Sequence, residues 1–180
     1  MAFKSMLAKA AGMAAVAVGV LGLGLPVAAS AKAPINGPTT CAIQTRNTGN
    51  YLTAVGGGGR TTDVIHTDAT RVGSWERFML IDSGDGSPNI HYGFLTTNGH
   101  YLTVVGGGGR ITDVIHSDAI RLQAWEKLSA VSLGNGFFAI QTIDGHYLTA
   151  VGGGGRTTDT IHSDATRIGT WEMFRFTCGI

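Results

Sequence analysis

The stretch YLTAVGGGGRTTDVIHTDATRVGSWE at residues 51–76 decides the fold, because close copies of it begin at Tyr101 and Tyr147. The first tyrosines of the three copies are 50 and then 46 residues apart, and the tryptophans near their ends keep the same spacing. Self-similarity at a nearly fixed period is typical of folds built from repeated units. The sequence therefore predicts three similar units joined by connecting loops of unequal length.

Each unit is predicted to contain four short strands. An apolar run such as CAIQT at residues 41–45 is followed by a turn rich in Asn, Asp and Gly and then by YLTAV, as in a hairpin. The four glycines at residues 56–59 do not suit a helix or a central strand, so they predict a flexible hairpin tip before a third strand around TDVIHT. The fourth strand is predicted at WERFML, which begins at Trp75. With no sustained helical period after the N-terminal region, the chain is predicted to be all-β with twelve strands.

The first 31 residues have the features of a secretory signal peptide. Two lysines precede an apolar run that extends to Val27, and small residues around Ser30 offer a cleavage site after Ala31. Because this site follows the apolar run directly and no cysteine lies near it, neither a membrane-spanning nor a lipid anchor is expected. The sequence predicts a secreted, extracellular protein that does not insert into a membrane.

Cleavage after Ala31 leaves 149 of the 180 residues, a length that suits one domain. We expect a short linker at residues 32–40 and one domain at residues 41–180, with repeats at about 41–80, 91–130 and 137–178. The mature chain has 11 Lys and Arg against 12 Asp and Glu. This balance offers no strong attraction to nucleic acid or to an anionic membrane, so neither partner is expected. The protein is expected to be a monomer.

Cys41 and Cys178 are the only cysteines, and they lie near the two ends of the predicted domain. In an oxidising compartment an isolated pair is most simply a disulfide bond. Such a bond requires the two ends of the domain to lie side by side. Catalytic and metal-binding roles for the two thiols are not expected.

Three four-stranded units, a closed body and adjoining termini describe a β-trefoil, in which six strands make a barrel and three hairpins cap it. The pattern G-x-Y-L-T-A, the VGGGGR turn and the late W-E also resemble the fascin-like β-trefoil modules of secreted bacterial proteins, over nearly the whole mature chain. This resemblance implies an all-β β-trefoil with pseudo-threefold symmetry. The ricin-type trefoil lectins carry Q-x-W in each unit, which this chain has only at residues 123–125, so their sugar-site residues are not transferred.

Each copy carries two aspartates, a histidine and an arginine on and after its third strand. Alternation along that strand points Ile65 into the core and His66 toward solvent. Carboxylates, an imidazole and a guanidinium can together bind the hydroxyl groups of a sugar, so these residues are the predicted ligand site. They are Asp63, His66, Asp68 and Arg71; Asp113, His116, Asp118 and Arg121; and Asp159, His162, Asp164 and Arg167. The alternative is that Asp68 and its copies bond the following turn and pair with the arginines as ordinary surface groups.

Other kinds of site are less well supported. One histidine and two aspartates on a short segment lack the spacing of zinc or calcium sites, so no metal or other cofactor is expected. Hydrolysis needs carboxylates with different pKa values, whereas copying gives them equivalent surroundings, and no G-x-S-x-G motif is present, so an enzyme is not expected. For sulfated or acidic sugars, Arg60 beside the glycines is the first place to examine.

Trp75, Trp125 and Trp171 could stack on sugar rings, but their place at the start of a predicted strand favours the barrel core. The favoured function is thus a non-catalytic, lectin-like carbohydrate-binding protein with up to three sites, which would gain avidity on a polysaccharide. The alternative is a protein-binding module, such as an inhibitor or a surface interaction protein, that uses the unmatched loop at residues 82–93. The second unit is more apolar than the others, so its site is expected to be the weakest.

Overall fold

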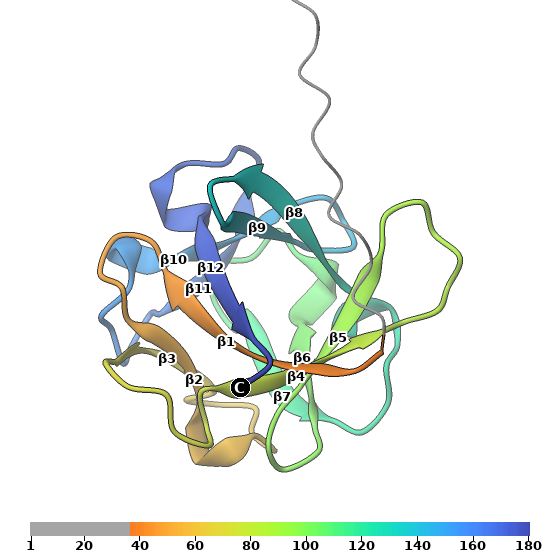
Figure 1. Ribbon diagram of the computed structural model, residues 1–180, viewed down its shortest axis with the longest axis horizontal. Coiled ribbons are helices and arrows are strands. Elements are labelled where there is room, and N and C mark those ends of the chain that lie inside the picture. The colour runs from red at the N-terminus through yellow and green to blue at the C-terminus, as the bar shows by residue number, and fades with distance from the viewer. Residues whose placement is uncertain (1–36) are drawn as a thin grey trace, which may run out of the picture.

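The computed structural model describes residues 37–180, so the predicted signal peptide and residues 32–36 of the predicted linker lie outside the described residues. The described residues form short strands joined by turns and 3₁₀ helices, which agrees with the all-β prediction (Figure 1). Among residues 37–180 no helix combines the length and the apolar character that crossing a membrane requires.

The twelve strands of residues 37–180 occur in three consecutive sets of four, which we call the first, second and third segments. The first contains β1 (Thr39–Thr45), β2 (Tyr51–Ala54), β3 (Ile65–Ala69) and β4 (Arg77–Asp82). The second contains β5 (His91–Leu95), β6 (Tyr101–Val104), β7 (Ile115–Ala119) and β8 (Leu128–Gly134). The third contains β9 (Phe137–Gln141), β10 (Tyr147–Ala150), β11 (Ile161–Ala165) and β12 (Phe174–Cys178). Strand β1 thus takes in the last two residues of the predicted linker.

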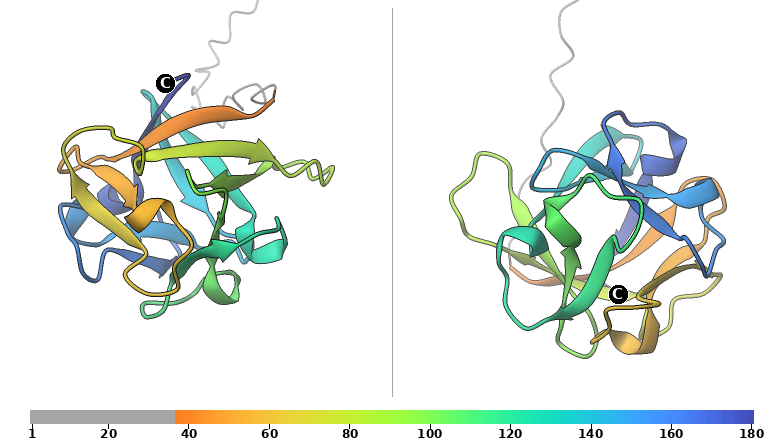
Figure 2. Two further views of the ribbon diagram at one scale, coloured as in Figure 1. Left: turned by 90° about the horizontal axis from the view of Figure 1, so that it is seen from below. Right: turned by 180° about the vertical axis from the view of Figure 1, so that it is seen from behind.

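Six strands close into a barrel. Antiparallel pairs join β1 to β4, β4 to β5, β5 to β8, β8 to β9, β9 to β12 and β12 back to β1. The remaining strands form the hairpins β2–β3, β6–β7 and β10–β11, which come to the front in the view from behind in Figure 2. A closed ring leaves no unpaired edge in the barrel. A six-stranded barrel with three hairpins is the arrangement expected of a β-trefoil.

The core fills the barrel and continues under the hairpins. Phe78, Phe94 and Phe174 are its largest fully buried side chains, one from each segment. Ile65 on β3 is also buried, with only 6% of its surface exposed, whereas the next residue, His66, is partly exposed. The predicted inward and outward orientation of these two residues is therefore confirmed.

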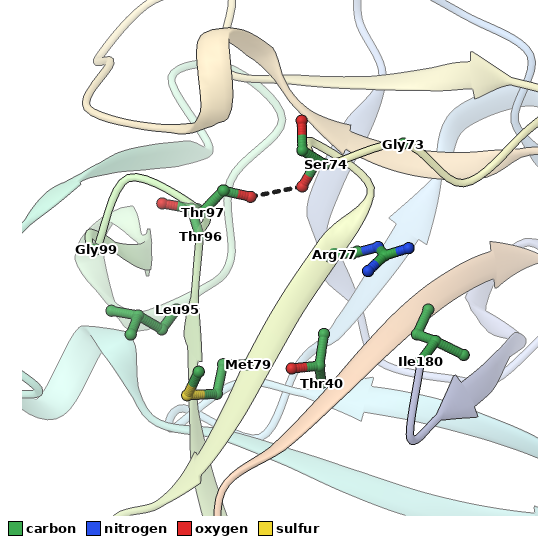
Figure 3. Close-up of a pocket in the computed structure, with 10 residues that line it drawn as sticks. All are labelled: Thr40, Gly73, Ser74, Arg77, Met79, Leu95, Thr96, Thr97, Gly99 and Ile180. Atoms are coloured by element: carbon green, nitrogen blue, oxygen red, sulfur yellow. Dashed lines mark hydrogen bonds between the residues drawn. The ribbon is translucent and has the colours of Figure 1, made fainter.

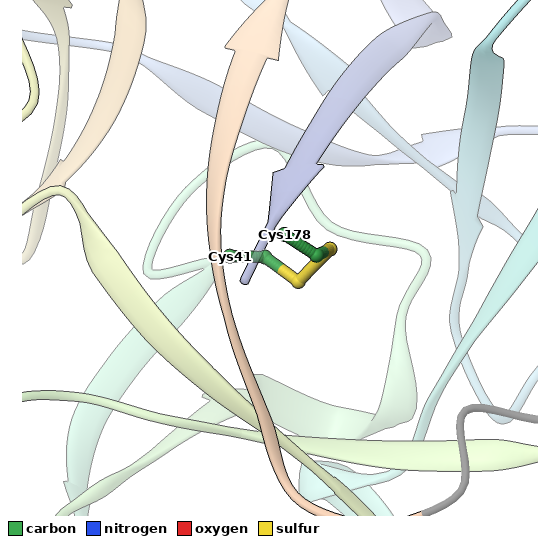
Figure 4. The surroundings of a disulfide bond; sticks show 2 residues. All are labelled: Cys41 and Cys178. Carbon is green, nitrogen blue, oxygen red and sulfur yellow. A yellow bond between two sulfur atoms is a disulfide. The ribbon is translucent and has the colours of Figure 1, made fainter. Parts of the chain in front are cut away.

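A disulfide bond joins Cys41 on β1 to Cys178 on β12, as predicted (Figure 4). The two residues are direct partners in the antiparallel pairing of the strands, with their Cα atoms 3.9 Å apart. This bond fastens the first barrel strand to the last, so it brings together the two ends of the domain.

The glycine runs lie in the turns between β2 and β3 and between the equivalent strands, as predicted, but they do not form free tips, and that part of the prediction is wrong. Residues Val55–Gly57 form a short 3₁₀ turn, and Gly57 and Gly58 are buried. The Gly59 N–H donates to the Ser117 carbonyl oxygen of the second segment at 2.6 Å. Equivalent bonds join the second segment to the third and the third to the first, at 2.7 Å each: Gly109 N–H to Ser163 and Gly155 N–H to Thr67. The runs therefore connect the three segments in a ring, and the preceding glycine, Gly58, approaches Thr96 of the second segment too closely to leave room for a Cβ.

Candidate functional site

Each hairpin presents an aspartate between a histidine and an arginine. In the first segment, His66 Nε2 lies 2.7 Å from Asp63 Oδ1, and Arg60 Nη2 lies 3.4 Å from Asp63 Oδ2. The Asp63 side chain is 51% exposed, so a ligand in solvent can reach it. The same contacts occur in the other segments, and we call these groups the Arg–Asp–His clusters: Arg60, Asp63 and His66; Arg110, Asp113 and His116; Arg156, Asp159 and His162.

The backbone on both sides of the aspartate fixes each cluster. Asp63 has a φ of +51°, a left-handed conformation that aspartate tolerates better than most residues. The two residues after it, Val64 and Ile65, are buried and anchor the start of β3. Before it, the Arg60 carbonyl oxygen accepts a hydrogen bond from the Ser117 N–H at 2.8 Å. Each cluster is therefore held by its own hairpin and by the next segment.

The structure brings together only part of the predicted site. Asp63 and His66 are in contact, but the arginine that joins them is Arg60 and not Arg71. Among residues 37–180, the side chains of Asp68 and Arg71 form no ion pair or hydrogen bond, so the predicted surface pairing of these two residues is wrong. The same division holds for Asp118, Arg121, Asp164 and Arg167. The spacing R-x-x-D-x-x-H at residues 60–66 is the sequence signal that could have identified the cluster.

The three tryptophans lie at the surface, which corrects the prediction that they are core residues. Trp75, Trp125 and Trp171 are 47%, 49% and 45% exposed. The fourth strand begins only at Arg77, two residues after Trp75. The tryptophans belong instead to the turn before the strand, which is a short 3₁₀ helix at Ala124–Glu126 and at Thr170–Glu172.

A buried glutamate holds each of these turns. Glu76 is only 8% exposed, and its carboxylate accepts hydrogen bonds from the Thr53 hydroxyl at 2.7 Å and from the Gly73 N–H at 2.6 Å. The other segments repeat this arrangement with Glu126 and Glu172. Because buried carboxylates require hydrogen-bond donors, this contact fixes the turn that presents the tryptophan. This contact was not among the predictions, although Thr53 and Glu76 are separated by the same 23 residues as their copies.

The Arg–Asp–His cluster and the tryptophan turn are attached to the same hairpin. His66 on β3 is the pairing partner of Thr53 on β2, and the Thr53 hydroxyl bonds Glu76. The next residue on β2, Ala54, donates its N–H to the Trp75 carbonyl oxygen at 2.8 Å. Each hairpin thus positions an ionic group and a half-exposed indole.

This combination suits a neutral polar ligand. The carboxylate accepts hydrogen bonds, the guanidinium donates them, the imidazole can do either, and an indole face can pack against C–H groups. Within the described part of the chain, no three His, Cys, Asp or Glu side chains converge as a metal ion would require.

The unmatched loop between β4 and β5 is fixed by Asp85. Its carboxylate accepts hydrogen bonds from Lys127 Nζ and His91 Nδ1, each at 2.9 Å. The Lys127 ammonium, and to a smaller extent His91 and a backbone N–H, hold the pKa of Asp85 well below its usual range. Lys127 belongs to the second segment, so this contact ties the loop back to the barrel.

Comparison with known proteins places the chain among the β-trefoils. ThreeFoil, a designed threefold-symmetric protein, is 15% identical with a TM-score of 0.64, over 77% of this chain and 97% of ThreeFoil. The Rhizoctonia solani agglutinin is 17% identical with a TM-score of 0.63, over 80% of this chain and 98% of the agglutinin. The BEL β-trefoil is 12% identical with a TM-score of 0.62, over 81% of this chain and 95% of BEL. No protein-family model and no curated protein sequence matches the chain. These likenesses confirm the predicted β-trefoil fold.

Proposed function

We propose that this protein is a secreted, non-catalytic, lectin-like β-trefoil that binds carbohydrate at up to three equivalent sites. The observation that supports this proposal most directly is the occurrence of one solvent-facing Arg–Asp–His cluster per segment, each on a hairpin that also holds a half-exposed tryptophan. Three four-stranded repeats with pseudo-threefold symmetry would account for this equivalence. The R. solani agglutinin provides a precedent within the same fold.

The proposed chemistry follows from the exposed groups. Sugar hydroxyls would donate hydrogen bonds to Asp63 and accept them from Arg60 and His66, while Trp75 packs against an apolar face of the ring. Asp68 and Arg71, which are exposed at the end of β3 and just after it, would contact the parts of the glycan beyond the first sugar. Each site would be weak, and simultaneous contacts along one polysaccharide would supply avidity.

The proposed location rests on two features. The Cys41–Cys178 disulfide is of the kind that persists in oxidising compartments outside the cell. The N-terminal residues have the composition of a secretory signal peptide. The resemblance of the chain to fascin-like modules, which occur on secreted bacterial proteins, also supports the proposed secretion.

The test is retention of the mature chain, beginning at Lys32, on arrays of soluble and insoluble polysaccharides. Two triple variants are compared with the native protein: one changes the cluster histidines to Ala, and the other changes the three tryptophans to Ala. His91→Ala is the matched control, because it removes a histidine outside the clusters. We expect the native protein and the control to bind one class of glycan and both triple variants to lose that binding.

Two results would contradict the proposal. If the native protein binds no glycan, the protein-binding alternative through residues 82–93 becomes the better explanation. If both folded triple variants bind as tightly as the native protein, a carbohydrate site exists elsewhere and the three-site assignment is wrong.

A further inference from the structure

A pocket of about 630 Å³ lies outside the Arg–Asp–His clusters, on the outer surface of the barrel where β1, β4 and β5 run side by side (Figure 3). Its floor is a row of three side chains that are partners across the strands: Thr40, Met79 and Leu95. Met79 points away from the core, and 40% of its surface is exposed. Met79 and Leu95 make this floor largely apolar, and Thr40 adds one hydroxyl group (Figure 3).

The walls of the pocket come from both sides of this floor. On one side, the Thr97 hydroxyl donates a hydrogen bond to the Ser74 carbonyl oxygen, which ties the turn before β4 to the end of β5. On the other side lies Ile180, which is 40% exposed. Arg77 extends between these walls, with its guanidinium on the side of Ile180 (Figure 3). A cation therefore stands beside an apolar floor.

The apolar floor occurs at only one of the three barrel junctions. Met79 stands four residues after Trp75 and pairs with Leu95. The equivalent cross-strand pairs in the other junctions are polar, Ser129 with Gln141 and Arg175 with Gln44. The pocket is therefore a departure from the repeat and not a product of it.

The cation also differs from its counterparts. Arg77 lies two residues after the tryptophan of its segment, and the equivalent residues are Lys127 and Met173. Lys127 forms an ion pair with Asp85, and the Met173 sulfur accepts a hydrogen bond from Arg46. The Arg77 side chain has no ion pair or hydrogen bond among residues 37–180. Its guanidinium is free to bind an anion.

We propose that this pocket binds a small organic anion with an apolar body, such as an aromatic or branched aliphatic acid. The acid group would form a charge-assisted, bidentate contact with Arg77, and the body would cover Met79 and Leu95. The volume lies within the range of about 300–1,000 Å³ that is usual for small-molecule sites. This site does not include the Arg–Asp–His clusters, although its wall at Gly73 and Ser74 belongs to the turn that carries Trp75.

The probe for the test is 8-anilinonaphthalene-1-sulfonate, which combines a sulfonate with an aromatic body and fluoresces when it leaves water. The neutral analogue N-phenyl-1-naphthylamine reports on the apolar floor alone. Arg77→Met introduces the residue type of Met173, and Met79→Ser with Leu95→Gln introduces those of the Ser129–Gln141 pair. Arg175→Met is the control, because it removes an exposed arginine from another junction.

We expect the native protein to bind the sulfonate with a saturable rise in fluorescence. Arg77→Met should weaken sulfonate binding about tenfold, as loss of one charge-assisted contact predicts, and change binding of the neutral probe less than about twofold. The double variant, Met79→Ser with Leu95→Gln, should bind both probes more weakly. The triple histidine variant should bind both probes as tightly as the native protein. The proposal is overturned if the native protein binds no sulfonate, or if Arg77→Met and Arg175→Met have equal effects.

Discussion

Gly58→Ala should destabilise the protein far more than Gly56→Ala, although both change the same glycine run. A Cβ at Gly58 would lie 2.9 Å from the Thr96 Cβ of the second segment and closer still to its hydroxyl oxygen. Gly58 also has φ 102° and ψ −175°, a conformation that is essentially restricted to glycine. A Cβ at Gly56 would meet nothing nearer than the Arg60 Cδ at 3.8 Å, and its φ of 68° and ψ of 9° are left-handed helical values.

The two substitutions therefore carry different costs in the free energy of unfolding. At Gly58 the backbone conformation costs about 1–3 kcal/mol and the steric overlap a further 1–3 kcal/mol or so, for a total of about 2–6 kcal/mol. At Gly56 only the left-handed conformation counts, at about 1–2 kcal/mol. For a domain of this size, each kcal/mol lowers Tm by about 3–4 °C.

Urea unfolding followed by far-ultraviolet circular dichroism, with the disulfide bond intact, measures the difference. Gly108→Ala and Gly154→Ala repeat the experiment at the other junctions, where a Cβ would lie 2.6 Å from the hydroxyl oxygens of Thr142 and Thr45, respectively. Equal stability of Gly58→Ala and Gly56→Ala would refute the reasoning that the glycine runs are packed between segments.

Three other predictions concern stability and one concerns binding. Cys41 and Cys178 are 137 residues apart, so their disulfide bond removes much of the entropy of the unfolded chain. Replacing both by Ala should lower the free energy of unfolding in urea by about 4–5 kcal/mol, and a loss under about 1 kcal/mol would contradict this argument. Folding lowers the pKa of Asp85 below its ordinary value of 3.8, so ionised Asp85 stabilises the fold above about pH 4, and this contribution is lost as the pH falls. Asp85→Asn should therefore be less stable than the native protein at pH 6. If unfolding curves show the same difference in stability at pH 2, the proposed role of Asp85 is wrong. Glu76→Ala leaves the two donors to its carboxylate without an acceptor and should cost about 1–3 kcal/mol for each, with an altered tryptophan emission spectrum; an unchanged thermal midpoint would show that the turn does not depend on the carboxylate. Of the three single histidine-to-Ala variants, His116→Ala should reduce glycan retention least, and equal losses from all three would show that the second site is as strong as the others.

The fold could be predicted from the sequence because its signals are local. Turn residues recur at a fixed spacing between short apolar runs, and alternation along β3 places Ile65 in the core. The cysteine pair added one long-range constraint, that the domain ends adjoin. The contacts between segments could not be predicted in the same way. The hydrogen bond from Gly59 to Ser117 joins residues 58 positions apart, and no local sequence pattern predicts it.

The candidate site shows a different limit of sequence reasoning. Size and hydrophobicity favoured a buried position for Trp75, but the carboxylate of Glu76 occupies the buried position beside it. Burial of a charged group depends on whether donors such as the Thr53 hydroxyl converge on it, and only the fold determines that. Likewise the predicted site grouped Arg71 with Asp63, whereas the turn after the glycines brings Arg60 to this aspartate.

The repetition and the departures from it point to two separate kinds of site on one scaffold. Residues that hold the hairpins and clusters, such as Thr53 and Glu76, face inward and are coupled to neighbouring groups, so a change in one copy would disturb its own turn. The outward pairs on the barrel hold no buried carboxylate, and a cross-strand pair of this kind contributes only about 0.2–1 kcal/mol. Met79 with Leu95 can therefore differ from Ser129 with Gln141 at little cost to the barrel. The same scaffold can thus carry the three proposed glycan sites on its hairpins and the proposed anion site on its barrel, and the polysaccharide arrays and the fluorescent sulfonate test the two kinds of site separately.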